Sequence, residues 1–268
     1  MVKPVEDFFE SYESFNNEFI KQEKIKSIKL TYSEKMDGAI IVSKPAIKKF
    51  HFDKNGIPTK EVYIESKGIY TDSSTIYFSF DPKTKLLEEE LISYHDEVIK
   101  RSFKYNSKNR MQSIATIKKI GMVSDTSAFE QYREPYSDEG FAKRIFLNSE
   151  ERPYLEERNY YEKKQLVRQE KDLIITSKSA TKEWIYHSGL LEKIEYFNAI
   201  NAYEKGTYSF EYINQNYLEY THLYINSQLS KKIAFVYAPK KATHLEAIVI
   251  RYEQEGKIEI IQLDYTYY

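Results

Sequence analysis

The stretch Phe78-Ser79-Phe80-Asp81-Pro82-Lys83-Thr84-Lys85-Leu86 contains the pattern that decides the fold. Two aromatic residues stand one apart, as they do on one face of a strand, and a polar turn follows before an apolar residue opens the next strand. Asp81 is placed to accept hydrogen bonds from the backbone of such a turn. The stretch therefore predicts a β-hairpin.

The same unit recurs along the chain. It is found at 50–56, 103–111, 210–218 and 250–258, with weaker copies that start at Ile145 and Trp184. The residues expected to form its turns are Asp53, Gly56, Asp81, Asn106, Asn109, Asn216 and Gly256. The second aromatic residues Phe52, Phe80 and Tyr105 are 28 and 25 residues apart, Tyr186 and Tyr212 are 26 apart, and Tyr212 and Tyr252 are 40 apart. The shorter interval fits two strands with two turns, and the longer one leaves room for an extra hairpin.

Alternation of apolar and polar residues extends the strand prediction to the rest of the chain. Ile28, Leu30 and Tyr32 alternate with polar residues, and a change of phase between Ile260 and Ile261 suggests a β-bulge in the last strand. The 25 Tyr and 15 Phe also favour strands. We expect an all-β fold, an extended antiparallel β-meander of repeated hairpins in a single open or curled sheet.

One helix is expected, at the N-terminus. Its apolar residues fall at helical spacing between positions 5 and 23: Val5, Phe8, Phe9, Tyr12, Phe15, Phe19 and Ile20. The predicted organisation is an N-terminal helix at 1–25, a first array of hairpins at 26–120, an irregular junction loop at 121–151 and a second array at 152–268. These parts are expected to form one continuous structural unit.

Composition argues against several kinds of function. Forty basic and forty-one acidic residues give a net charge of −1, so no overall field attracts nucleic acid. Cysteine is absent, and five scattered histidines have no ligand spacing, so we expect no metal site and no cofactor. The sequence also lacks the G-x-S-x-G, Walker and dinucleotide-binding motifs, and it suggests no catalytic residue.

The recurring unit resembles the YD or Rhs-type repeats of bacteria, in which tyrosines precede an Asp and a Gly-containing turn. It is also similar to variant MORN repeats, in which an Asn-Gly turn follows an aromatic strand. The chain departs from both patterns, with Asn at 106, Ile213 and Glu253 in place of Asp, and Asn at 109 and 216 in place of Gly. The resemblance implies a repeat protein, and the MORN likeness implies an antitoxin-like or immunity-like protein that occludes a partner.

Tyrosines are the residues in greatest excess, and some are expected on an exposed sheet face. The candidate partner-binding residues are Tyr217, Tyr220, Tyr224, Tyr132 and Tyr136. An aromatic face suits contact with a protein or a glycan, whereas a purely structural role would only stiffen the sheet. The rival from another class is a hydrolase with its site in the 121–151 loop. No apolar run is long enough to cross a membrane, so we expect a cytoplasmic protein, or an exported or cell-envelope protein if a signal peptide has been removed.

Overall fold

The computed structural model describes residues 3–4, 6, 8–107, 109, 111–120, 123–133, 141–148, 150–163, 165–200, 203–214, 217–239 and 241–268, without the side chains of 123–133, 141, 241 and 242. These residues form a 3₁₀ turn, η1 (Tyr12–Ser14), a helix, α1 (Asn17–Gln22), and 18 strands. The first nine strands are β1 (Ile25–Met36), β2 (Val42–Phe52), β3 (Pro58–Lys67), β4 (Tyr70–Phe80), β5 (Leu87–Tyr94), β6 (Glu97–Tyr105), β7 (Met111–Ile120), β8 (Val123–Arg133) and β9 (Phe141–Leu147). The others are β10 (Pro153–Glu162), β11 (Gln165–Leu173), β12 (Ser179–His187), β13 (Leu190–Asn198), β14 (Glu204–Ile213), β15 (Tyr217–Ile225), β16 (Gln228–Ala238), β17 (Lys241–Tyr252) and β18 (Lys257–Tyr267).

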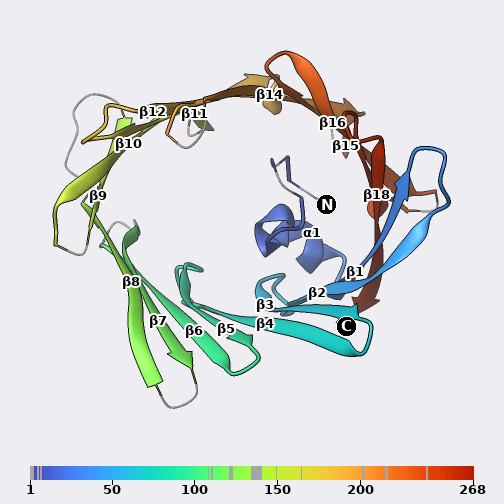
Figure 1. Ribbon diagram of the computed structural model, residues 1–268, viewed down its shortest axis with the longest axis horizontal. Coiled ribbons are helices and arrows are strands. Elements are labelled where there is room, and N and C mark those ends of the chain that lie inside the picture. The colour runs from blue at the N-terminus through green and yellow to red at the C-terminus, as the bar shows by residue number, and fades with distance from the viewer. Residues whose placement is uncertain are drawn as a thin grey trace.

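Each strand pairs antiparallel with the next one along the chain, and β1 also pairs with β18. The sheet therefore curls round on itself, with the N-terminal residues inside the curl (Figure 1). This confirms the predicted fold class, an antiparallel meander in a single curled sheet with a helix near the N-terminus. Side chains alternate along each strand between an inner face, which meets the N-terminal residues, and an outer face.

Successive turns lie at opposite ends of the sheet because the strands are antiparallel and follow in chain order. We call the end with the turns after β2, β4 and the other even-numbered strands the Gly56 end. The end with the turns after the odd-numbered strands is the Gly256 end. Most copies of the repeated aromatic pair lie at the Gly56 end, whereas the predicted copy at 250–258 lies at the Gly256 end.

The repeated aromatic pair has a common structural basis at the Gly56 end. The strand register shifts at the second aromatic residue, as at Phe52, Phe80, Tyr105, Tyr186 and Tyr212. Such a shift is a β-bulge, which bends the strand and redirects its last side chain. Tyrosine hydroxyls at this end donate to carbonyls of the preceding strand: Tyr105 to Leu87 (2.8 Å), Tyr212 to Leu191 (2.8 Å), Tyr237 to Leu218 (2.9 Å) and Tyr265 to Leu245 (2.6 Å).

The predicted interval of 40 residues between Tyr212 and Tyr252 does not separate equivalent positions. Tyr252 ends β17 and so lies at the Gly256 end, whereas Tyr212 lies at the Gly56 end. The equivalents of Tyr212 are Tyr237 and Tyr265, which make the same bond to a backbone carbonyl. The sequence pattern missed Tyr237 because Ala238 and Pro239 follow it in place of an Asp or Asn turn.

The structure places the predicted turn residues between strands. The Asp53 carboxylate accepts the N–H groups of Asn55 and Ile57 at 2.8 and 2.9 Å, and Gly56 has a φ of +77°. Asp81 accepts backbone N–H groups of the next turn, and these hydrogen bonds, that of Thr84 above all, lower the pKa of its carboxyl. The other predicted turn residues within the described part of the chain are Asn106, Asn109 and Gly256, whereas Asn216 lies outside it.

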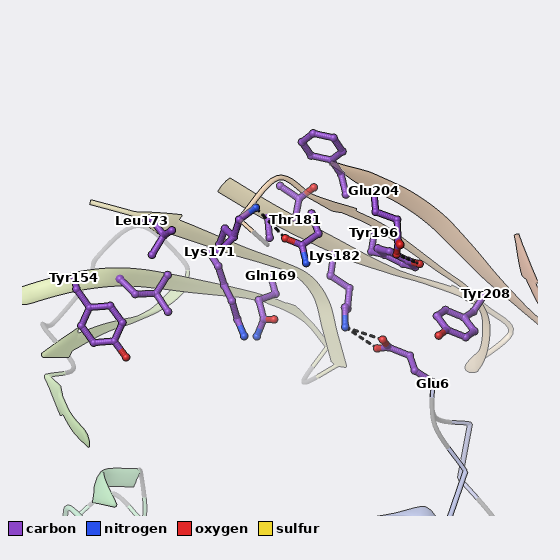
Figure 2. Close-up of a pocket in the computed structure, with 15 residues that line it drawn as sticks. Glu6, Tyr154, Gln169, Lys171, Leu173, Thr181, Lys182, Tyr196, Glu204 and Tyr208 are labelled. Carbon is purple, nitrogen blue, oxygen red and sulfur yellow. Dashed lines mark hydrogen bonds and ion pairs between the residues drawn. The ribbon is translucent and has the colours of Figure 1, made fainter. Parts of the chain in front are cut away.

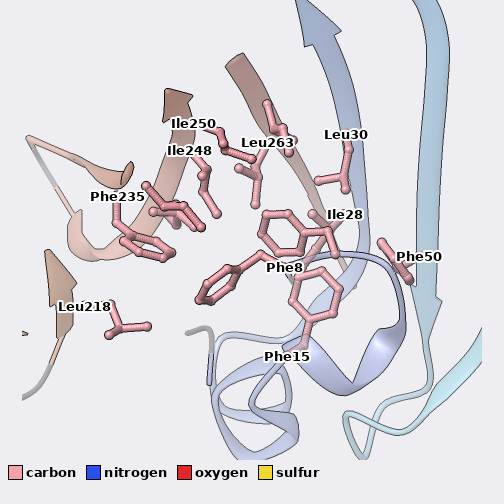
Figure 3. Packing of buried hydrophobic residues seen from close by; sticks show 14 of the residues in the cluster. Phe8, Phe15, Ile28, Leu30, Phe50, Leu218, Phe235, Ile248, Ile250 and Leu263 are labelled. Atoms are coloured by element: carbon pink, nitrogen blue, oxygen red, sulfur yellow. The ribbon is translucent and has the colours of Figure 1, made fainter. Parts of the chain in front are cut away.

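The N-terminal segment, residues 3 to 24, supplies much of the core. Phe15 is fully buried, and its ring centroid lies 5.0 Å from that of Phe50 and 5.6 Å from that of Phe52. Phe8 contacts Phe235 of β16, with ring centroids 4.9 Å apart. Figure 3 shows the segment packed against the inner face of the sheet, whose contributing side chains include Ile28, Leu30, Leu218, Ile248, Ile250 and Leu263. One sector of the curled sheet is therefore filled by the chain's own N-terminus.

The helix predicted between positions 5 and 23 is much shorter in the structure. It begins after Asn16, whose side chain accepts the backbone N–H groups of Glu18 and Phe19. Upstream, Phe9 has a φ of 63° and donates its N–H to the Ser14 hydroxyl, so the chain there is not helical. The apolar residues of the N-terminal segment recur at helical spacing, but several of them are buried against the sheet from a segment that is largely irregular. Positions 5 and 7 lie outside the described residues.

The irregular loop predicted at 121–151 is wrong for 123–133 and 141–147, which form β8 and β9. β8 pairs with β7 from Ile120 opposite Val123 onward, and β9 pairs with β10. Few apolar residues alternate in this stretch, so its sequence gives little sign of a strand. Its structure is determined by pairing with neighbouring strands, which cannot be read from the sequence alone. Positions 134–140 lie outside the described residues. The two predicted arrays, 26–120 and 152–268, are parts of one sheet.

The helical segments within the described residues are too short and too polar to cross a lipid bilayer.

Candidate ligand-binding site

The predicted tyrosine surface is only partly assembled. Tyr220 and Tyr224 lie on the outer face of β15, on either side of His222, with ring centroids 6.1 and 6.4 Å from the His222 ring. Tyr217 instead contacts Tyr237, which packs against the core, with centroids 5.6 Å apart. Tyr132 lies in β8 without a described side chain, and Tyr136 lies outside the described residues.

Charged side chains flank this outer row, which we define as Tyr220, His222 and Tyr224. The Lys232 ammonium lies 4.4 Å from the Tyr220 ring centroid, a cation–π contact. His222 Nδ1 lies 3.3 Å from a Glu211 carboxylate oxygen. The outer row is therefore a half-buried aromatic strip, and the charged side chains beside it, Lys232 and Glu211, already contact its rings.

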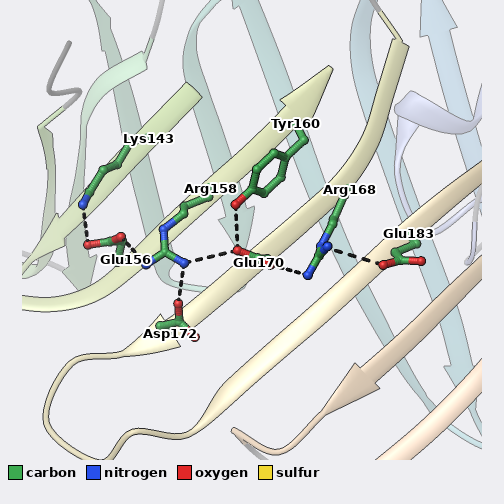
Figure 4. A network of polar contacts seen from close by, with 8 residues as sticks. All are labelled: Lys143, Glu156, Arg158, Tyr160, Arg168, Glu170, Asp172 and Glu183. Atoms are coloured by element: carbon green, nitrogen blue, oxygen red, sulfur yellow. Dashed lines mark hydrogen bonds and ion pairs between the residues drawn. The ribbon is translucent and has the colours of Figure 1, made fainter. Parts of the chain in front are cut away.

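A network of ion pairs covers the outer face of β9 to β12 (Figure 4). Arg158 contacts Glu156, Glu170 and Asp172 at 2.6, 3.2 and 3.0 Å. Burial alone would raise the pKa values of Glu156 and Glu170, but hydrogen bonds from their partners, including Arg158, lower both. The ionised form of both carboxylates is therefore favoured, and basic side chains beside them balance their negative charge.

The adjacent acids Glu156 and Glu157 point to opposite faces of β10. Glu156 lies in the outer network, whereas Glu157 is 5% exposed on the inner face, near Arg144 at 3.7 Å and Lys171 at 3.5 Å. The pair therefore does not form two carboxylates converging on a bond, as glycoside hydrolysis requires. Among the described residues, no group of three His, Asp or Glu side chains is arranged to hold a metal ion.

A cavity of about 570 Å³ opens on the inner face of β10 to β14, and we call it the β10–β14 cavity (Figure 2). Its apolar wall includes Tyr154, Leu155, Leu173, Ala180, Tyr196, Ile200 and Tyr208. Its polar lining includes Glu6, Gln169, Lys171, Lys182, Asn198 and Glu204. The volume lies within the range of roughly 300–1,000 Å³ that ligand pockets occupy.

Strand alternation brings these polar groups together. Gln169, Lys182 and Tyr196 are consecutive partners across β11, β12 and β13, so they share the inner face. Tyr196 lies over Gly206 of β14, where an added Cβ would come within 2.5 Å of the Tyr196 ring. A glycine is therefore required for that ring to lie flat on the wall, and the Tyr196 hydroxyl donates to Glu204 at 2.8 Å.

The N-terminal segment reaches this cavity through Glu6. The Lys182 ammonium donates to both carboxylate oxygens of Glu6, at 2.7 and 2.9 Å. Lys182 also lies 5.8 Å from the ring centroid of Trp184. Figure 2 shows the Glu6 carboxylate approaching Lys182 from inside the curl, at the opposite end of the cavity from Tyr154 and Leu173.

A second cavity, of about 630 Å³, lies beside the N-terminal segment and is lined by β1, β2, β3 and β18. Lys44 there bridges Glu34 at 3.0 Å and Glu259 at 2.8 Å, and Lys257 contacts Glu259 at 2.9 Å. The Tyr252 hydroxyl donates to the same carboxylate at 3.1 Å. These contacts make the site a compact ion-pair cluster inside the sheet.

Replacing Glu259 with Gln is expected to flatten the acid dependence of stability. Burial alone would raise the pKa of Glu259, but hydrogen bonds and charges from Lys44 and Lys257 lower it from 4.5 to about 2. A lowered pKa stabilises the fold above the unfolded value, and that contribution is lost as pH falls from 4.5 toward 2. Urea unfolding should show Glu259→Gln less stable at pH 7 by about 1–3 kcal/mol, with the difference shrinking below pH 4.

The control for this change is Glu255→Gln, which removes the same charge from an exposed position in the adjoining turn. It should leave stability within about 0.5 kcal/mol at every pH. A constant difference between the wild-type protein and Glu259→Gln from pH 7 to pH 3 would contradict the role assigned to Glu259.

Sequence patterns did not reveal the inner polar residues of the β10–β14 cavity. Charged residues in strands are usually solvated, so there was no reason from the sequence to place Lys171, Lys182 and Glu204 in a cavity. Whether such a residue faces the interior depends on how the sheet curls. The one available signal was a charged residue at an inward phase of a strand, as for Lys182 two residues before Trp184. That signal identifies a site only once the sheet is known to surround an interior.

Fold and site together define a curled antiparallel sheet with an internal N-terminal segment and an inner-face cavity. No protein-family model matches the chain, and no curated protein matches its sequence. A porin-like protein from Bacteroides uniformis is a structural match with 10% identity and a TM-score of 0.42, over 91% of this chain and 97% of that one. A LolA superfamily protein from Nitrosomonas europaea matches with 8% identity and a TM-score of 0.21, over 90% of this chain and 84% of that one. Likenesses of this strength carry no inference about function.

Proposed function

We propose that the chain is a non-enzymatic binding protein that holds a small, partly apolar molecule in the β10–β14 cavity. The observation that carries the proposal is the composition of this cavity, in which an aromatic and aliphatic wall meets a few converging polar groups. Ligand sites in proteins are concave and mostly apolar, with a small number of polar groups that orient the ligand. The carboxylates of β10 and β11 favour binding over hydrolysis, because they are paired with basic side chains and the adjacent Glu156 and Glu157 do not converge as a pair of catalytic acids would.

The outer row supports a second candidate, contact with a protein or a glycan. Tyr220, His222 and Tyr224 present rings in line on one strand, and aromatic rings provide contact area at low entropic cost. An antitoxin-like or immunity-like role, which the resemblance to MORN repeats implies, would use a surface of this kind. The row is shallow, however, and its charged neighbours are already bonded, so the cavity is the better-supported site.

Two substitutions of the same kind separate these candidates. Ala180→Trp places a large ring in the cavity wall, and Ala234→Trp places one on the outer face, opposite Tyr220 in the register. We expect calorimetric titration to detect one bound molecule of at least one twelve-carbon amphiphile among dodecanoate, dodecanol and dodecylamine. Ala180→Trp should abolish this binding, and Ala234→Trp should leave it unchanged.

The proposal is overturned if none of the three amphiphiles binds the wild-type protein, or if binding survives in Ala180→Trp. Binding of cellohexaose or chitohexaose that only Ala234→Trp abolishes would move the function to the outer row. Circular dichroism and urea unfolding of both variants would show that each retains the fold.

A further inference from the structure

We infer that Glu6 occupies the position of a ligand carboxylate, so that the β10–β14 cavity takes an amphipathic monocarboxylate with its head at Lys182 and its apolar chain toward Leu173. This inference rests on the proposed function and names the class of ligand. It also assigns the N-terminal segment a competing role, because Glu6 and the ligand head cannot both occupy Lys182.

The contact between Glu6 and Lys182 has the geometry of a bound carboxylate. Both oxygens of Glu6 lie within hydrogen-bond distance of the Lys182 ammonium, at 2.7 and 2.9 Å. Both side chains are about one-third exposed, at 30% and 29%, so water and a solute can reach the pair. An exposed ion pair contributes little to stability, typically about 0–1 kcal/mol, so a competing carboxylate can displace it at small cost.

The charges around Lys182 favour an anion once Glu6 leaves. Within the described part of the chain, Glu6 is the only carboxylate paired with Lys182. The nearby Glu204 accepts the Tyr196 hydroxyl, and the Lys171 ammonium, which also lines the cavity, lies 3.5 Å from Glu157, so both of these groups already have partners. An ammonium in a partly apolar wall without a counterion is unfavourable, so the empty position selects a negative group.

The remainder of the cavity is suited to an apolar chain. From Lys182 the lining continues through Ala180 and Leu155 to Leu173 and Tyr154, at the end of the cavity away from Glu6 (Figure 2). The polar side chains beside this stretch of wall include those of Gln169, Lys171 and Asn198 on the neighbouring strands. A ligand with one charged head and one apolar chain matches this distribution better than a polyol, which would leave its hydroxyls without partners.

The position of Glu6 in the chain makes displacement feasible. Glu6 lies outside the helical turns of the N-terminal segment, and among the described residues the first buried side chain after it is Phe8. The core contacts of Phe8 and Phe15 hold the segment inside the curl without requiring the Glu6 contact. Glu6 can therefore leave Lys182 while the segment stays anchored.

The test compares dodecanoate with dodecanol in four proteins: wild type, Glu6→Gln, Lys182→Met and Glu10→Gln. Glu10 is an exposed acid of the same segment and serves as the matched control for loss of one charge. We expect Glu6→Gln to tighten dodecanoate binding by about tenfold and Lys182→Met to weaken it by at least tenfold. Dodecanol should change less than threefold in both variants, and Glu10→Gln should bind both molecules as the wild type does.

Failure of the inference and failure of the proposed function give different results. If both amphiphiles bind in a manner sensitive to Ala180→Trp, but Glu6→Gln leaves dodecanoate affinity unchanged or weakens it, Glu6 is only a structural tether and the inference fails alone. Dodecylamine binding more tightly than dodecanoate would also overturn it. If no amphiphile binds any of the four proteins, the proposed function fails as well.

Discussion

Replacing Phe15 with Ala is expected to lower the free energy of unfolding by about 3–5 kcal/mol, the cost of removing a buried aromatic ring. The Phe15 side chain is 0% exposed and lies against Phe9, Phe50 and Phe52. It joins the N-terminal segment to β2, so its loss leaves a cavity between the segment and the sheet. Urea unfolding followed by circular dichroism measures this change.

The control for Phe15→Ala is Tyr70→Ala, because the Tyr70 side chain is 72% exposed at the start of β4. That change should alter stability by no more than about 0.5 kcal/mol. A loss below 1 kcal/mol for Phe15→Ala would mean that the N-terminal segment is not part of the core, and the account of the interior would be wrong.

Gly56→Ala is expected to destabilise the protein by about 2–5 kcal/mol, for two reasons that add. Gly56 has a φ of +77°, which costs a residue with a Cβ about 1–2 kcal/mol. The new Cβ would lie 2.2 Å from the Asn17 carbonyl oxygen and 3.0 Å from the Lys21 backbone nitrogen, so α1 must move away from the turn. Forcing such a shift in packed structure typically costs a further 1–3 kcal/mol.

Gly68→Ala separates these two costs. Gly68 also has a positive φ, +65°, but an added Cβ there has no neighbouring atom within 4 Å. We expect a loss of about 1–2 kcal/mol from backbone strain alone. Equal losses at both glycines in urea unfolding would show that α1 does not pack against the Gly56 turn.

The sequence predicted the hairpins well because their determinants are local. In the Phe78 to Leu86 unit, strand, turn and next strand lie within nine residues, and the Asp81 side chain bonds inside that turn. The ends of the sheet were harder to assign, since Tyr212 and Tyr252 look alike in sequence but lie at opposite ends. Chain order settles that question only when every strand is counted, and β8 and β9 were missed.

The inner face was not predictable because it holds charged residues where patterns lead one to expect apolar ones. On β18, Ile258 and Ile260 alternate with Glu259, and a bulge was expected after Ile260. The structure instead has continuous register there, with Glu259 beside Lys44 at the inner cavity and Ile261 in the core. An ion-pair cluster inside a curled sheet compensates the buried charge, and its partners come from strands far apart in the chain.

The cavity depends on the same long-range geometry. Glu6 and Lys182 are 176 positions apart, and neither lies in a motif that announces a ligand site. The excess of tyrosine predicted an exposed aromatic face, and Tyr220 and Tyr224 do lie on the outer face of the sheet. Other aromatic residues, such as Tyr154, Tyr196 and Tyr208, line the cavity instead.

The most direct test of the central claim is a crystal structure of the protein with 12-bromododecanoate, using anomalous scattering to locate the bromine. The account predicts a single strong bromine site in the β10–β14 cavity near Tyr154 and Leu173, with the carboxylate at Lys182 and Glu6 displaced from it. A cavity without bromine at saturating ligand, or bromine only on the outer face, would contradict the claim that the interior of this sheet is a binding site.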